Sequence, residues 1–326
     1  MRSFCLARPP VLGGIVAMMV AGSPAAYGGD GPWVAGNGNA SIYLGVESQR
    51  IERLDVRDGD GGGEVIDVDS GLSTFGVKAI GSVGIRDRLE VEVAVPWYHV
   101  QANRVSGPVC QSLALSACDT TETIGLITVR GKGTILDEFY GAPVAFSLGL
   151  ESRFGHFTSA TRARITNVGE GTQDFGVFTS VGRSNSWGAN GFWTAYVEGL
   201  ARYRLSNTNT YTGADGEEIK VPGIEFNVDS KALMGWSRDF GIGPSVGLYS
   251  RPQGLDFGKL DLTDEDRFSA LKVTNVRIGL HALFRANEHI TFTASALKVV
   301  YARNNPYTTT VSVGVSHFGL LRKRKD

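Results

Sequence analysis

The chain has 326 residues, with 32 basic and 33 acidic side chains and a formal net charge of -1. This balance lacks the basic excess with which proteins bind nucleic acid, so we expect no nucleic-acid partner. Three cysteines are too few for a disulfide scaffold or a four-cysteine zinc module. Glycine accounts for 43 residues, roughly double its usual share, which disfavours helical bundles and favours strands and turns.

Residues 1–28 have the pattern of a secretory signal peptide. Arg2 and Arg8 give the first eight residues a positive charge. The apolar stretch VLGGIVAMMVA follows, and small residues come next in SPAAYG. This apolar stretch is shorter than the about 20 residues of a membrane-spanning helix, so we expect cleavage. The mature chain then keeps Cys110 and Cys118, and in an exported protein this close pair predicts a loop disulfide.

Alternation of apolar and polar residues dominates the chain after residue 40. In RLEVEVAVPWYHV, every second residue from Leu89 to Trp97 is apolar, whereas Glu90 and Glu92 belong to the opposite face. No later segment approaches the about 18 uninterrupted apolar residues of a spanning helix, so only strands could cross a membrane. About twelve alternating runs begin near residues 40, 70, 88, 122, 143, 172, 190, 223, 241, 268, 289 and 307.

The connections between these runs alternate in length. Short ones such as IRDR, SRDFG and RANEH are followed by long polar ones, except for the short last connection, ARNNPY. Outer-membrane barrels have short periplasmic turns and long extracellular loops, whereas a secreted sandwich or soluble barrel gives no reason for this alternation. We therefore predict an all-β fold: a single transmembrane antiparallel up-and-down β-barrel of about 12 strands over residues 29–320. Both termini would be periplasmic, with residues 321–326 as a basic tail.

The polar face of the strands supplies the candidate lumen. In a membrane barrel the apolar face meets lipid and the polar face lines the interior. Paired charges could fill this interior, or they could line a narrow pore whose positive excess favours anionic solutes, and we favour the pore. The charged lumen-lining candidates are Glu90, Glu92, Arg130, Lys132, Glu151, Arg153, Glu198, Arg202, Arg204 and Arg277.

We expect three partners for such a barrel: outer-membrane lipid, lipopolysaccharide and the barrel assembly machinery. Phe318 is the candidate terminal aromatic of the assembly signal. The acidic segment 261–267 favours a solvated loop, with calcium binding or a bridge to lipopolysaccharide as the alternatives. Candidates for the aromatic girdles at the membrane interfaces are Trp97, Trp187, Trp193, Tyr203, Trp236 and Tyr249.

The sequence contains no recognisable catalytic motif, and we expect no enzyme, metal or cofactor. Residues 58–69 space carboxylates as a calcium loop does, but the EF-hand pattern fails at Gly62, which favours a solvated loop. A barrel lipid hydrolase remains an alternative. Ser316 and His317 are its nearest approach to a dyad, and neighbouring strand residues point to opposite faces.

The stretch from about residue 80 to 205 resembles the outer-membrane family named for the MetA pathway of phenol degradation, which is grouped with long-chain fatty-acid transporters. The matching pieces are LEVEVAVPWY, GLITVRGKG, APVAFSLGLESRFG, GEGTQDFGVFTSVGRS and ARYRL, and VVYARNNPYTTTVSVGVSHF is similar to the family's end. The chain departs from the family at Arg153-Phe154-Gly155, and no long N-terminal plug precedes its first strand.

This resemblance covers about half of the mature chain. It implies a channel or transporter for a small-molecule solute, including hydrophobic or aromatic compounds. A structural barrel, or one that interacts with partners through its surface loops, is the alternative that the residues leave open.

Overall fold

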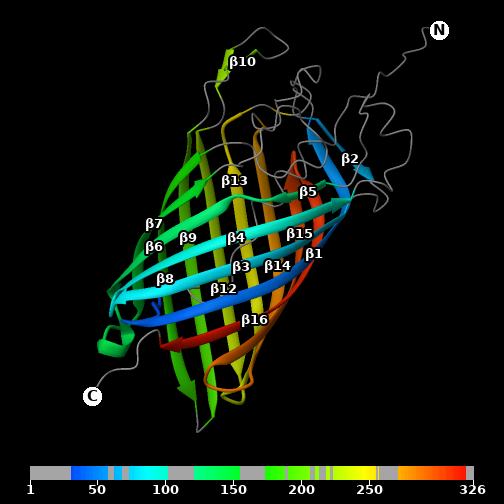
Figure 1. Ribbon diagram of the computed structural model, residues 1–326. Helices are drawn as coiled ribbons and strands as arrows, with labels where there is room; N and C mark the ends of the chain where they lie inside the picture. The colour runs from blue at the N-terminus through cyan, green and yellow to red at the C-terminus, as the bar shows by residue number, and fades with distance from the viewer. Residues whose placement is uncertain are drawn as a thin grey trace, which may run out of the picture.

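The computed structural model of the chain (Figure 1) is nearly all strand. Within the part of the chain that it describes, no helix is long and apolar enough to cross a membrane. The described residues are 31–57, 62–67, 73–101, 121–154, 173–187, 190–205, 210–212, 218–220, 223–254, 256 and 271–320.

Several predictions from the sequence lie outside these residues. They are the signal peptide 1–28, the pair Cys110 and Cys118, the acidic segment 261–267 and the tail 321–326.

Twelve antiparallel strands form a closed barrel, in which each strand pairs with the next along the chain. The last strand pairs with the first, from Asn39 against Leu320 to Leu54 against Pro306. The predicted up-and-down barrel is thereby confirmed. Its strands are β1 (Asn39–Arg57), β3 (Ser73–Arg86), β4 (Leu89–Gln101), β6 (Ile127–Leu136), β7 (Ala145–Phe154), β8 (Gln173–Trp187), β9 (Gly191–Leu205), β12 (Ile224–Gly235), β13 (Phe240–Arg251), β14 (Val273–Arg285), β15 (Ile290–Arg303) and β16 (Pro306–Leu320).

Short accessory elements lie beside the barrel strands. β2 (Gly63–Asp67) pairs with the end of β1, and β5 (Thr121–Ile124) pairs with the end of β4. β10 (Thr210–Thr212) and β11 (Glu218–Lys220) form a separate hairpin, and η1 (Glu138–Tyr140) is a single 3-10 turn. These elements were not expected from the sequence, in which β5 and β6 read as one run.

The two ends of the barrel differ. We call the end where β1 begins and β16 ends the turn end, because the short connections 87–88, 137–144, 188–190, 236–239 and 286–289 all lie there. The opposite end, the loop end, carries the longer connections and β2, β5 and β10 (Figure 1). The one short connection at the loop end contains Asn304, whose left-handed backbone (φ 49°) is one that asparagine tolerates better than most residues.

The outward face of the barrel is apolar. On β1, for example, Ile42, Leu44 and Val46 are exposed, while the residues between them are buried. The same alternation runs along the other walls, as for Leu148 and Leu150 of β7. Such a continuous exposed apolar surface requires a lipid environment, and it is the arrangement of a transmembrane barrel.

Candidate functional site: the barrel lumen

The ten charged residues singled out in the sequence occupy the inward face, because they alternate with exposed apolar residues of the same strands. Two of them, Arg130 and Glu198, are half-buried. The others are buried, namely Glu90, Glu92, Lys132, Glu151, Arg153, Arg202, Arg204 and Arg277.

Cross-strand pairing places charges of alternating sign in one row near the loop end. Arg130 of β6 pairs with Glu151 of β7, which pairs with Gly176 of β8. Gly176 in turn pairs with Arg202 of β9, and Arg202 pairs with Glu225 of β12. Because Gly176 has no side chain, Arg202 can reach across β8 to Glu151, and its Nη2 lies 2.6 Å from Oε1 of that carboxylate.

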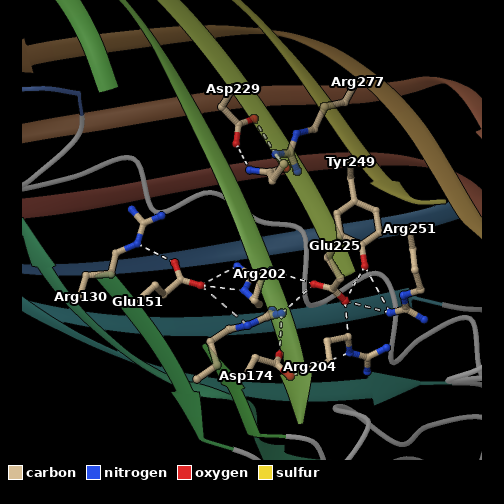
Figure 2. A network of polar contacts seen from close by, with 12 residues as sticks. Arg130, Glu151, Asp174, Arg202, Arg204, Glu225, Asp229, Tyr249, Arg251 and Arg277 are labelled. Carbon is tan, nitrogen blue, oxygen red and sulfur yellow. Dashed lines mark hydrogen bonds and ion pairs between the residues drawn. The ribbon is translucent and has the colours of Figure 1, made fainter. Parts of the chain in front are cut away.

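Glu225 is the centre of the resulting network (Figure 2). Its Oε2 accepts hydrogen bonds from Arg202 Nη1 at 2.8 Å and from Arg153 Nη2 at 3.0 Å. Its Oε1 accepts from Tyr249 Oη at 2.9 Å and from Arg251 Nη2 at 3.0 Å. The Glu225 residue is 2% exposed, so its charge is balanced by these partners rather than by water.

Glu151 links the centre of this network to the half-buried part of the lumen. Arg130 Nε donates to Glu151 at 2.7 Å, while Arg130 Nη2 donates to Glu198 at 2.9 Å. The Arg130 guanidinium also lies over the ring of Phe178, at 4.6 Å from its centroid, where a cation–π interaction adds to the ion pairs.

Two further carboxylates complete the ion pairs of this wall. Asp174 lies 2.8 Å from Arg153 Nη2 and 3.9 Å from Arg204 Nε. Separately, Arg277 Nη2 donates to Asp229 at 2.6 Å (Figure 2).

Five residues of these clusters were not predicted from the sequence to face the lumen. The same alternation would have found them, since Glu225 and Asp229, for example, alternate with the outward Phe226 and Val228. When they are included, the loop-end network has five arginines and four carboxylates. Its surplus of positive charge is therefore smaller than the residues chosen from the sequence predicted. The missed residues are Asp174, Glu225, Asp229, Tyr249 and Arg251.

Tyr249 also corrects an expectation. It was a candidate for the outward aromatic girdle, but it is buried at 4% exposure and donates its hydroxyl hydrogen bond to Glu225 inside the barrel. The neighbouring Leu248 takes the outward position on β13. Trp187, Tyr203 and Trp236 are exposed.

Solvent reaches part of the inward face. Beside the buried network, several inward charged side chains from widely separated strands are only half-buried, which shows that side chains do not fill the whole interior. These residues are Glu47, Lys78, Arg130, Glu198, Asp229 and Lys231.

A short segment before β1, residues 31–38, enters the lumen at the turn end, and we call it the strap. Ala35 N donates to Glu90 Oε2 at 2.6 Å, and Lys132 Nζ donates to the carbonyl oxygen of Gly31 at 3.1 Å. Lys132 and Glu90 also lie 3.8 Å apart, so this second charged pair holds the strap rather than facing open solvent.

The strap contacts the barrel wall closely near both of its ends. Trp33 Nε1 donates to Glu138 at 2.9 Å, and the Trp33 ring packs edge-on against Tyr196. At the other end a β-carbon on Gly84 would overlap the carbonyl oxygen of Gly36, so β3 needs glycine where the strap passes. The strap therefore occupies part of the lumen, which its non-periodic sequence did not reveal.

The arrangement of Ser316 and His317 gives no catalytic dyad. Ser316 Oγ donates to the carbonyl oxygen of Thr291, while the ring of His317 stacks on that of His289. Among the described residues, no three histidine, cysteine or acidic side chains gather in a way that could hold a metal ion.

No protein-family profile matches the chain, and no curated protein matches it in sequence. Its fold is similar to that of an outer membrane channel from Pseudomonas putida F1, with a TM-score of 0.60 at 13% identity over 91% of this chain and 99% of that one. The NanC porin (TM-score 0.46, 11% identity) covers 84% of this chain and 98% of its own. The KdgM porin (TM-score 0.42, 7% identity) covers 85% and 98%. At 13% identity, the similarity to the Pseudomonas putida channel shows the fold alone, which is a barrel of the kind found in outer-membrane channels. The resemblance to the MetA family stays a prediction.

Proposed function

We propose that the protein is an outer-membrane channel for small solutes. The observation that carries this proposal is a closed twelve-strand barrel with an apolar outward face and an inward face of charged side chains that solvent reaches. Barrels of this kind place long loops outside the cell and short turns in the periplasm, so we assign the loop end to the outside. Both ends of the barrel chain, Asn39 and Leu320, then face the periplasm.

The path for solute runs beside the buried network rather than through it. The packed side chains around Glu225 thicken the wall formed by β6 to β13 and narrow the lumen near the loop end. The half-buried residues, such as Lys78 and Asp229, carry both signs of charge and border the remaining space. A narrow pore lined by both signs favours small polar solutes over large ones.

The solute class follows from this lining together with the family resemblance. The resemblance points to small hydrophobic or aromatic compounds. A wholly apolar molecule would displace water from the charged side chains without replacing its hydrogen bonds, which is costly. We therefore propose aromatic or similar small compounds that also carry a polar or ionised group.

Conductance in planar lipid bilayers tests the proposal. The purified barrel should produce discrete conducting events in salt solution, and an aromatic carboxylate added to one side should lower the current. Absence of both conductance and solute flux into liposomes would contradict the channel.

A structural barrel with a filled lumen is the second candidate, because the network around Glu225 and the strap both occupy the interior. It predicts an intact barrel in the same bilayers with no conductance.

A further inference from the structure

The outward face of the barrel carries a basic patch near the loop end, which we define as Arg50, Arg53 and Lys298. Arg50 is exposed between the buried Gln49 and Ile51 of β1, so it projects away from the lumen. Arg53 and Lys298 are exposed as well, on β1 and β15 respectively.

Strand pairing brings the basic patch together, since β1, β16 and β15 lie side by side (Figure 1). Lys298 pairs with Thr309 of β16, and Thr309 pairs with Arg50 of β1. At about 4.8 Å between neighbouring strands, the Cα atoms of Lys298 and Arg50 are about 10 Å apart. Arg53 lies further towards the loop end, with its guanidinium carbon 4.9 Å from the ring centroid of Tyr307.

Two carboxylates of the described residues lie beside the patch: Glu52, and Asp67 of β2, which pairs across the strands with Arg53. Glu52 accepts a hydrogen bond from Thr309 at 2.8 Å and lies 3.4 Å from Lys298 Nζ. Among the described residues, three cations against these two carboxylates leave a surplus of one positive charge on a surface otherwise suited to lipid.

Charge at these outward positions is unusual for this barrel. The outward positions of β6, β7, β9, β12 and β13 carry no charged side chain, and those of β8 carry one, Arg183. A cation on the lipid face is strongly unfavourable at the bilayer midplane and costs little at the interface. The patch must therefore lie at the level of lipid head groups.

The height of Arg50 agrees with this placement. Arg50 comes 11 positions after Asn39, the first residue of β1 at the turn end. At about 3.3 Å per residue and a tilt of about 40°, it stands about 28 Å above that end, close to the about 25 Å height of an apolar band. Ile42, Leu44 and Val46 form the apolar surface below it.

We propose that the basic patch binds the phosphate groups of an outer-leaflet glycolipid of the lipopolysaccharide type. The assignment to the outer leaflet rests on the proposed orientation of the barrel, with its loop end outside. Guanidinium groups bind phosphate oxygens in a bidentate manner, and the ammonium of Lys298 adds a third cation. The hydroxyl of Tyr307 supplies a further donor, and the apolar residues below Arg50 contact the acyl chains.

Lipid binding to the purified full-length barrel tests this site, measured by native mass spectrometry from detergent micelles. The probes are lipopolysaccharide, the same lipid after removal of its lipid-anchor phosphates, and phosphatidylglycerol. The variants are Arg50→Gln/Arg53→Gln/Lys298→Gln and the single Arg53→Gln. The matched control is Arg183→Gln, because Arg183 is an exposed outward arginine on β8, away from the patch.

The triple variant should bind lipopolysaccharide about tenfold more weakly than the wild type, Arg53→Gln about threefold more weakly, and Arg183→Gln as the wild type does. Unchanged binding by the single and triple variants would overturn the proposal. The proposal would also be overturned if the dephosphorylated lipid bound as tightly as intact lipopolysaccharide. If phosphatidylglycerol bound as tightly as lipopolysaccharide, the assignment to a glycolipid would be overturned. Heat-modifiable migration on a gel checks that each variant is folded. If the triple variant does not fold, lipid binding by Arg53→Gln tests the proposal on its own. Conductance of these variants is expected to stay at the wild-type level, so a failed lipid test leaves the channel proposal standing.

Discussion

At the scale of single residues, the lumen depends on a few buried carboxylates. Glu225 contacts four arginines and one tyrosine at once, and little water reaches any of these groups. Taking paired charges out of water is costly, so removing one partner leaves the others buried without compensation. Glu198, by contrast, is half-buried, and it accepts a hydrogen bond from Arg130 Nη2 at 2.9 Å.

We predict that Glu225→Gln destabilises the barrel by about 3–5 kcal/mol, because four buried arginines lose a common counter-charge. Glu198→Gln is the control, and it should cost less, about 1–2 kcal/mol, because Arg130 keeps its ion pair with Glu151. Urea unfolding in lipid vesicles measures both. Equal losses for the two variants would show that Glu225 has no special place in the network.

Ion selectivity should respond to the half-buried charges that border the solute path. Arg130→Gln removes a positive charge and should shift the permeability ratio towards cations by roughly two- to fivefold. Glu198→Gln removes a negative charge from the same ion pair and should shift the ratio the opposite way. Reversal potentials across planar bilayers with a salt gradient measure the ratio. Shifts of the same sign, or none, would place this pair away from the path.

At the scale of elements, the strap is the part of the chain that most limits the turn end of the lumen. Its polar contacts reach β4, β6 and η1, and it passes directly over Gly84 of β3. The charged pair Glu90 and Lys132 therefore holds the strap at the turn end, whereas the network around Glu225 lies near the loop end.

Gly84→Ala should displace the strap without changing its sequence, because the new methyl group would overlap the carbonyl oxygen of Gly36. We expect a larger single-channel conductance with an unchanged barrel. Gly81→Ala is the matched control, since it adds the same methyl group to the same strand where no atom lies within 4 Å. If Gly84→Ala conducts as Gly81→Ala does, the strap does not limit the pore.

At the scale of the whole molecule, pairing of the first and last strands closes the barrel. β1 and β16 pair over almost their full lengths, with one irregularity between Ile51 and Arg53. Closure removes the exposed strand edges that an open sheet would present to lipid, where unpaired backbone groups are very costly.

Disulfide cross-linking tests this closure and its register. In a chain with Cys110 and Cys118 replaced by serine, Val46→Cys with Val313→Cys should cross-link on oxidation, because these positions face each other. The diagonal pair, Val46→Cys with Val311→Cys, should not cross-link, since its Cα atoms are too far apart for a disulfide. Migration of the unfolded chain on a gel distinguishes the cross-linked form. Efficient cross-linking of the diagonal pair alone would contradict the register.

The sequence by itself determined the strand number, the alternation of short and long connections, and which face of each strand is polar. These are local properties, because a strand turns successive side chains to opposite sides whatever its neighbours are. Only the tertiary structure decided which charges meet. Arg202 reaches Glu151 across Gly176 because the barrel sets the relative heights of β7, β8 and β9, and no spacing along the chain encodes that stagger. The entry of the strap into the lumen was likewise decided by the closed wall that surrounds it, since its contacts come from strands far away in the sequence.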